Sequence, residues 1–129
     1  MNQEKMSDDT PTIDFAKMDG LVPGIVQDAK TGEVLMVGFL NSVSYAKTLE
    51  SGFVTFWSRT RQKLWMKGET SGNRLRIVSV STDCDNDTLL FRVQVEGDGL
   101  VCHEGTVSCF TQPIALAANS DAKKEETRG

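Results

Sequence analysis

An acidic segment in the second half of the chain has the residue types and spacing of a cation site. It reads Asp83-Cys84-Asp85-Asn86-Asp87. In an extended backbone, side chains two residues apart share a face, so the three aspartates would converge and the thiol of Cys84 would face the other side. Converging carboxylates repel one another unless a hard divalent cation such as Mg²⁺ is held between them. A plain hairpin turn rich in Asp and Asn is the alternative, and the spacing alone leaves it open.

The three cysteines, Cys84, Cys102 and Cys109, form a second chemically active group. An odd number cannot pair completely within one chain, so we expect free thiols in a reducing compartment. None of the spacings is C-x-x-C, and three thiolates would leave zinc one open position for a water molecule. Buried structural cysteines are the alternative. His103, the only histidine, directly follows Cys102 and suits proton transfer near neutral pH.

A basic segment between residues 59 and 76 contains a single acid, Glu69, in a chain of net charge −4. Its basic residues are Arg59, Arg61, Lys63, Lys67, Arg74 and Arg76. This local surplus is typical of a site for a phosphate-bearing ligand. Trp57 and Trp65 lie in or beside the segment and could stack on a purine. A solvated basic loop, with both tryptophans in the core, is the alternative.

Strands are expected to carry most of these groups. Residues 25–28 and 34–39 are apolar runs around a short loop, which predicts a β-hairpin. The alternation in 74–81 and 89–95 predicts a second hairpin whose turn is the acidic segment. Aromatic and β-branched residues over 53–57 predict a further strand.

A short helix is predicted over residues 42–50. Asn41 is a favourable N-cap, and Gly52 stands where a C-cap glycine is common. One face of this helix carries Tyr45, Ala46 and Leu49. Residues 58–73 show no clear periodicity and are predicted to form a long, ordered binding loop.

These elements predict one β-dominated α+β domain with a mixed or antiparallel sheet and one short helix. The domain is expected to span residues 12–118, between disordered polar tails at 1–11 and 119–129. The 18 acidic residues against 14 basic ones argue against a nucleic-acid or anionic-membrane partner. No apolar run approaches the roughly 20 residues that span a bilayer. The start of the chain lacks a signal-peptide pattern, so we expect a cytoplasmic protein.

Taken together and in this order, the motifs resemble the phosphoribosyl-AMP cyclohydrolase family of histidine biosynthesis. The resemblance covers about residues 13–112. Its matching segments, in one-letter code, are GLVP (20–23), GEVLM (32–36), FWSRTRQKLW (56–65), KGETSGN (67–73), DCDND (83–87), CH (102–103) and SCF (108–110).

This resemblance implies a hydrolase that opens the N1–C6 bond of the adenine ring of 1-(5-phosphoribosyl)-AMP. It also implies an intertwined homodimer with one zinc ion per subunit at the interface. Cys102 and Cys109 match two zinc ligands of one subunit, and Cys84 matches the third, contributed by the partner. The magnesium ligands match Asp83, Asp85 and Asp87.

From these matches we infer that zinc lowers the pKa of a bound water and that His103 takes its proton. Hydroxide then adds to C6, and collapse of the adduct breaks the N1–C6 bond. Magnesium and the basic segment are expected to hold the two phosphates. The residues expected to bind substrate are Trp57, Arg59, Arg61, Lys63, Trp65, Lys67, Glu69, Ser71 and Asn73.

Two departures from the family pattern are visible. Met66 stands where a basic residue is expected in many relatives, so one phosphate contact is either missing or supplied by Arg61. The chain ends soon after Phe110, so a single activity is expected, without the phosphoribosyl-ATP pyrophosphatase domain fused to some relatives.

Two other functions stay open. One is a non-catalytic nucleotide-binding dimer held together by zinc. The other is a single-stranded nucleic-acid binder, against which the acidic net charge counts.

Overall fold

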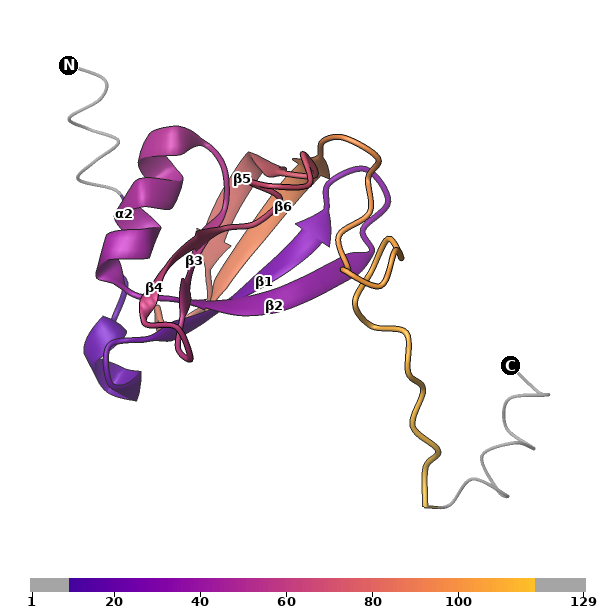
Figure 1. The fold of residues 1–129 in the computed structure, drawn as a ribbon. Coiled ribbons are helices and arrows are strands. Elements are labelled where there is room, and N and C mark those ends of the chain that lie inside the picture. Colours follow the sequence, from indigo (N-terminus) through magenta and orange to yellow (C-terminus); the bar gives the residue numbers. More distant parts are fainter. Residues whose placement is uncertain (1–9, 118–129) are drawn as a thin grey trace.

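The computed structural model describes residues 10–117, which form a four-stranded sheet, a two-stranded sheet and one α-helix (Figure 1). The predicted β-dominated fold with a mixed sheet and one helix is confirmed. Most of each predicted tail lies outside the described residues. No helix of the described part is long and apolar enough to cross a membrane. The elements are η1 (Phe15–Met18), β1 (Val22–Asp28), β2 (Val34–Leu40), α2 (Ser42–Ser51), β3 (Thr55–Ser58), β4 (Lys63–Met66), β5 (Leu75–Thr82) and β6 (Leu89–Val95).

The main sheet has the strand order β2-β1-β6-β5. β1 pairs with β6 in parallel, whereas the β1–β2 and β5–β6 pairs are antiparallel hairpins, as predicted. Leu89 pairs with Gly24 and Val93 with Asp28, so the turn between β5 and β6 lies near the beginning of β1. This turn is the acidic segment, and the parallel pairing therefore places it beside the N-terminal part of the described chain.

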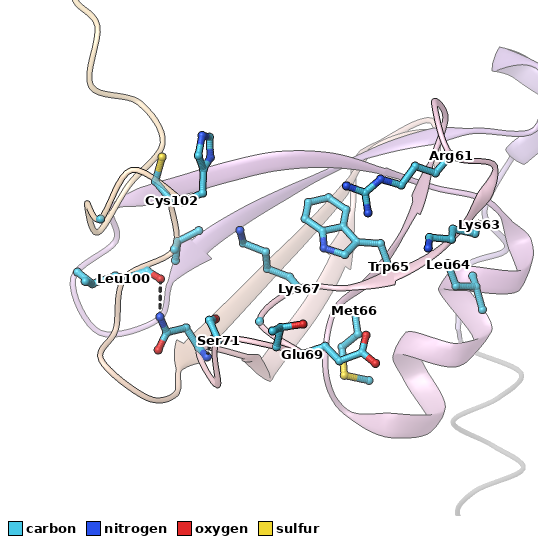
Figure 2. A pocket seen from close by; sticks show the side chains of 16 residues that line it. Arg61, Lys63, Leu64, Trp65, Met66, Lys67, Glu69, Ser71, Leu100 and Cys102 are labelled. Carbon is cyan, nitrogen blue, oxygen red and sulfur yellow. Dashed lines mark hydrogen bonds between the residues drawn. The ribbon is translucent and has the colours of Figure 1, made fainter.

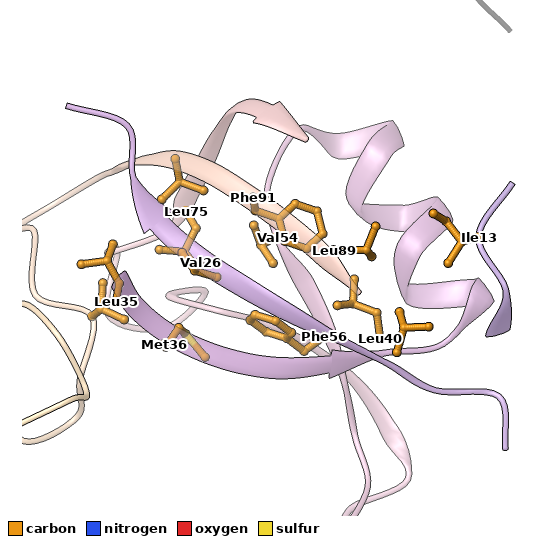
Figure 3. Packing of buried hydrophobic residues seen from close by; sticks show 13 residues of the cluster. Ile13, Val26, Leu35, Met36, Leu40, Val54, Phe56, Leu75, Leu89 and Phe91 are labelled. Carbon is orange, nitrogen blue, oxygen red and sulfur yellow. The ribbon is translucent and has the colours of Figure 1, made fainter. Parts of the chain in front are cut away.

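The core lies between the main sheet and the elements that cross it, as Figure 3 shows for its apolar side chains. Phe56 of β3 and Phe91 of β6 are the largest fully buried side chains. Gly38 of β2 leaves room for the aromatic ring of Phe56, because a Cβ at this position would lie 2.5 Å from the ring. The small β3–β4 sheet can therefore pack closely against β2, which fixes the position of the basic segment relative to the core.

The helix begins and ends as predicted but buries a different face. Asn41 caps it in a reciprocal capping box with Ser44, and Gly52 ends it with a left-handed backbone (φ 82°). The fully buried side chains of α2 are Ser44 and Thr48, whereas Leu49 is 50% exposed. The hydroxyl of Thr48 accepts the backbone N–H of Thr55 at 2.9 Å, and its one proton lies within reach of the carbonyl oxygens of Ser44 at 2.8 Å and Thr55 at 3.0 Å. Thr48 can be buried because it satisfies the backbone at the start of β3, and Ser44 because its hydroxyl belongs to the capping box.

The basic segment contains a strand that the sequence analysis placed in a loop. β4 pairs with β3 in antiparallel register, with Trp65 opposite Phe56. The backbone N–H of Gln62 donates to the carbonyl oxygen of Ser58 at 2.8 Å, and Gln62 takes a left-handed conformation (φ 56°). The ring centroids of Phe56 and Trp65 lie 5.5 Å apart. This tertiary contact holds the strand, and the absence of clean alternation in residues 63–66 explains why it was missed.

We predict that Thr48→Val lowers the free energy of unfolding by about 1–3 kcal/mol, because a buried N–H and a buried carbonyl of Thr55 lose their hydroxyl partner while the side-chain shape is kept. Urea denaturation followed by circular dichroism measures the change. The matched control is Thr111→Val, at an exposed position, which we expect to change stability by less than about 0.5 kcal/mol. Equal effects of the two variants would show that the Thr48 hydroxyl contributes nothing specific.

Candidate active site

A pocket of about 680 Å³ lies between β4, the turn that follows it and the loop after β6 (Figure 2). Seven of the nine side chains predicted to bind substrate line it: Arg61, Lys63, Trp65, Lys67, Glu69, Ser71 and Asn73. Figure 2 shows Trp65 and Lys67 near the middle, with Arg61 on one side and Cys102 on the other. The Nζ atom of Lys67 lies 5.5 Å from the centre of the Trp65 ring. The pocket therefore combines positive charge with an aromatic ring that is 39% exposed.

Two predicted substrate residues, Trp57 and Arg59, are not among those that line this pocket. Trp57 follows the buried Phe56, and side chains alternate along β3, so Trp57 faces away from the core position of its neighbour. The guanidinium of Arg59 lies 4.3 Å above the ring of Phe39. The structure gives Arg59 a cation–π contact with Phe39 instead of a position in the pocket.

The loop after β6 forms one wall of the pocket, which the sequence analysis did not foresee. Asn73 fastens this wall: its side-chain Nδ2 donates to the carbonyl oxygen of Leu100 at 3.0 Å, the dashed line in Figure 2. Its Oδ1 accepts the backbone N–H of Asp98 at 2.7 Å. A Cβ at Gly97 would lie only 2.1 Å from Asn73 Oδ1, so the turn depends on a glycine there. Asn73 thus shapes the pocket through its amide.

Cys102 and Cys109 are brought together by two short backbone arrangements. A turn closes after Cys102, where the backbone N–H of Gly105 donates to the Cys102 carbonyl oxygen at 2.9 Å. Cys109 is pinned to β2, because its N–H donates to the carbonyl oxygen of Leu35 at 2.8 Å. The buried Ser108 donates its hydroxyl to the carbonyl oxygen of Val34 at 2.9 Å. The two thiols lie close enough for each to affect the pKa of the other as a result.

The surroundings of these two thiols shift their pKa values in opposite directions. The backbone N–H of Glu104, with the Thr106 hydroxyl and the Cys109 thiol, lowers the pKa of Cys102 against an opposing effect of desolvation. Burial, followed by the neighbouring Cys102, raises the pKa of Cys109. Cys102 is therefore the thiol that ionises first, and a thiolate is the form that binds soft metal ions.

His103 is almost fully exposed beside the thiol pair. Its side chain is 87% exposed, and its Nε2 lies 3.4 Å from a carboxylate oxygen of Glu104. It lines the same pocket as Cys102 and the basic side chains. The imidazole is therefore free to meet a molecule bound in the pocket.

The three aspartates of the acidic segment converge as predicted, but through a turn. One ligand atom from each of Asp83, Asp85 and Asp87 lies within 4.8 Å of the others. The backbone is not extended, because Asn86 is left-handed (φ 61°) and Asp83 Oδ1 accepts the backbone N–H of Asp87 at 2.9 Å. Strand alternation is thus the wrong explanation for the convergence, and the hairpin turn itself produces it.

The surroundings of Asp83 and Asp87 shift the pKa values of these two carboxyl groups in opposite directions. Desolvation alone would raise the pKa of Asp83, but the N–H groups of Asp87 and Thr88 outweigh it and lower this pKa to about 2. Lys17 lowers the pKa of Asp87, whereas Asp83, desolvation and Asp85 raise it, and the net shift is upward. Lys17, which the sequence analysis missed, reaches the cluster from η1 with its Nζ 3.3 Å from Asp85 Oδ2 and 3.1 Å from Asp87 Oδ2.

Cys84 lies in the acidic turn and is exposed. Within residues 10–117, the three aspartates are the one group of three potential metal ligands that lie within reach of each other. The described chain therefore presents a thiol pair and, separately, a carboxylate cluster that carries the third thiol. A pocket that gathers basic side chains, an aromatic ring, a thiol and a histidine has the features of an enzyme active site.

Comparison with known proteins narrows this class to one family. Residues 36–111 match the sequence profile of phosphoribosyl-AMP cyclohydrolase. The phosphoribosyl-AMP cyclohydrolase of Solibacter usitatus (strain Ellin6076) is 57% identical over 98 residues, which are 76% of this chain and 77% of that protein. The chain belongs to the phosphoribosyl-AMP cyclohydrolase family and is an enzyme.

Longer relatives match over the same length of chain. The histidine biosynthesis bifunctional protein HisIE of Escherichia coli (strain K12) is 60% identical over 98 residues, 76% of this chain and 47% of that protein. The protein of the same name from Bacteroides thetaiotaomicron is 57% identical, with the same coverage. The aligned part thus amounts to about half the length of these bifunctional relatives.

We predict that Asn73→Ala loosens the wall of the pocket and lowers the free energy of unfolding by about 1–3 kcal/mol, because two backbone groups of the loop lose their partner. Asn73→Asp keeps the acceptor for Asp98 but not the donor for Leu100, and should show a smaller loss. Urea denaturation and the KM for substrate are the measurements. An Asn73→Ala protein of unchanged stability that no longer binds substrate would show that Asn73 is a direct ligand instead.

Proposed function

We propose that this chain hydrolyses the N1–C6 bond of the adenine ring of 1-(5-phosphoribosyl)-AMP, a step of histidine biosynthesis. The observation that carries the proposal is the pocket itself, which gathers basic side chains, an exposed tryptophan, Cys102 and His103 around one space. These are the groups that the reaction requires: anchors for phosphate, a surface for the base and a proton acceptor. Family membership and the names of the matched relatives support this substrate.

The basic side chains of the pocket would hold the phosphates of the substrate. Arg61, Lys63 and Lys67 belong to one stretch of chain, and the side chains of all three line the pocket. Guanidinium offers paired hydrogen bonds to phosphate, and ammonium offers a compact charge. The exposed ring of Trp65 provides a stacking surface for the base between these anchors.

The donor set at Cys102 and Cys109 fits zinc. The two thiols are neighbours, and Cys102 has a lowered pKa that favours its thiolate. We propose that Cys84 of the partner subunit completes the set in a homodimer, since Cys84 lies in the separate acidic turn of its own subunit. Three thiolates of this kind would hold the ion, and the chemistry that zinc would supply there is a lowered pKa of a bound water molecule.

His103 would serve as the proton acceptor for the attacking water. As water adds to C6, one of its protons passes to the imidazole of His103 and is returned to N1 when the N1–C6 bond breaks, while the C6 hydroxyl releases the other proton to solvent as its carbonyl forms. The ribosyl group on N1 makes C6 electrophilic, which lowers the barrier to addition. Exposure of the imidazole in the pocket, with only Glu104 near its Nε2, leaves it free for this transfer.

The aspartate cluster fits magnesium, because carboxylate oxygens from three residues converge at one point. We propose that a magnesium ion held by Asp83, Asp85 and Asp87 helps to bind a phosphate of the substrate.

We place the reaction in the cytoplasm, since the three free thiols require a reducing compartment.

We predict that His103→Ala folds normally and retains zinc but loses turnover by about 10²- to 10⁴-fold, the usual contribution of a general base. The assay follows the absorbance change when phosphoribosyl-AMP is added to the purified protein with excess magnesium. Wild-type turnover should disappear on zinc chelation and return when zinc is restored. A folded, zinc-loaded wild-type dimer without turnover would overturn the proposed function, and unchanged turnover of His103→Ala would remove that residue from the mechanism.

We predict that Cys109→Ala and Cys84→Ala each lose zinc, and that a heterodimer of the two variants recovers about half of the wild-type zinc content, because one of its two sites is complete. Each variant carries a different affinity tag, so that the heterodimer can be isolated after co-expression and its metal content measured. If all three thiols came from one subunit, the heterodimer would contain no zinc. Full zinc content in Cys109→Ala alone would contradict the ligand assignment.

A further inference from the structure

Lys17 is the one cation that the described structure places at the aspartate cluster. It belongs to η1, a single turn of 3-10 helix that precedes β1, and it lies about 70 positions from the cluster in the sequence. Its Nζ donates to Asp85 Oδ2 at 3.3 Å and to Asp87 Oδ2 at 3.1 Å. Asp85 is 56% exposed and Asp87 only 18% exposed, so the ammonium bridges an outer and an inner carboxylate.

The ammonium occupies the Oδ2 atoms of Asp85 and Asp87, for which a divalent cation bound between these two residues would compete. A Mg²⁺ ion bound to two carboxylate oxygens lies between them at about 2.1 Å from each. An ammonium that bridges the same two carboxylates at hydrogen-bond distance fills that region and uses the same lone pairs. Lys17 and a cation that binds Asp85 and Asp87 together cannot keep these positions at the same time.

The segment around Lys17 is held in place independently of its ammonium. Ile13 is a member of the core, and the ring of Phe15 lies 5.8 Å from that of Tyr45. The backbone N–H of Asp14 donates to the carbonyl oxygen of Asn86 at 2.8 Å, which ties the segment to the acidic turn. Lys17 can therefore leave the carboxylates by rotation of its flexible side chain, with the backbone unchanged.

We propose that Lys17 is a built-in competitor for the divalent cation: its ammonium binds Asp85 and Asp87 and offsets part of their negative charge when no metal is bound, and it must leave when a metal binds. It thereby sets the affinity and selectivity of the cluster. A cation that binds weakly or fits poorly does not compensate for the two charge-assisted hydrogen bonds that it displaces. A doubly charged ion that binds three carboxylates does compensate for them. This inference rests on the proposed function only in taking the aspartates as a cation site.

The opposite role is also physically reasonable and makes the opposite prediction. Lys17 could hold Asp85 and Asp87 in the geometry that the cation needs, so that its loss would weaken binding. Competition predicts that loss of the ammonium tightens binding. The direction of the change therefore decides between the two roles.

The experiment titrates Mg²⁺ into full-length wild-type protein, Lys17→Met and Lys30→Met by isothermal calorimetry at one ionic strength. Lys30 is the matched control, because it is an exposed lysine in the turn after β1, at the opposite end of that strand from the acidic turn. Lys17→Met should bind Mg²⁺ about 5- to 30-fold more tightly, while Lys30→Met stays within about twofold of wild type, since a distant surface charge is screened by salt. Lys17→Arg, which keeps the charge, should stay close to wild type.

Each outcome decides the matter. Tighter binding by Lys17→Met alone supports competition, as does measurable binding by that variant where wild type shows none. Equal affinity of Lys17→Met and Lys30→Met, or weaker binding by Lys17→Met, overturns it. If neither wild type nor Lys17→Met binds, and Asp85→Asn behaves identically, the cluster is not a cation site; zinc-dependent turnover then tests the rest of the proposed function separately.

Discussion

The candidate active site depends on hydrogen bonds that hold the segment after β6 in position, although this segment has no helix or strand of its own. After β6, the described chain contains no regular element, yet this part carries Cys102, His103 and Cys109. Backbone groups outside regular structure need other partners, and here the side chain of Asn73 and the backbone of β2 supply some of them. Asn73 holds one end of the segment and Ser108 holds the other against β2. Among the described residues, no buried side-chain polar atom lacks a partner. The segment that carries the thiol pair is therefore attached to ordered structure at both of its ends.

The position of Cys84 in the acidic turn links the two halves of the proposed chemistry. If a partner's Cys84 joins Cys102 and Cys109, the aspartates on either side of it approach the same pocket. One contact between subunits would then bring together the thiols, the carboxylates and the basic side chains. The apolar side chains that follow Cys109 support such an assembly, because Phe110, Ile114 and Leu116 are 64%, 89% and 66% exposed in one subunit. In Figure 1, this part of the chain runs away from the sheet.

The sequence predicts the parts of this structure that local patterns govern. One hairpin of the main sheet follows from apolar runs around a short loop and the other from alternation, and the helix ends follow from Asn41 and Gly52. Seven of the nine expected substrate residues meet in one pocket because they belong to one continuous segment. Contacts between distant residues leave no local signal. The pairing of Trp65 with Phe56 created a strand where no alternation was visible, and the burial of Thr48 depended on a backbone partner seven residues away. The hydrogen bonds of Asn73 to the loop after β6 and of Lys17 to the aspartates could not be predicted from the sequence for the same reason.

Opposite charges at the pocket and the cluster determine how one substrate can use both. The basic pocket attracts phosphate directly, whereas three bare carboxylates repel it. With Lys17 in place, the cluster still carries two uncompensated negative charges if all three aspartates are ionised. The raised pKa of Asp87 reflects this crowding. Under this proposal, a divalent cation that displaces Lys17 would lower the negative charge of the cluster from two units to one and would offer an incoming phosphate a doubly positive centre. The cluster would then take part in substrate binding only after the metal is bound. Substrate binding at this end of the site would thus be conditional on metal binding, and Lys17 would set how readily the cation binds.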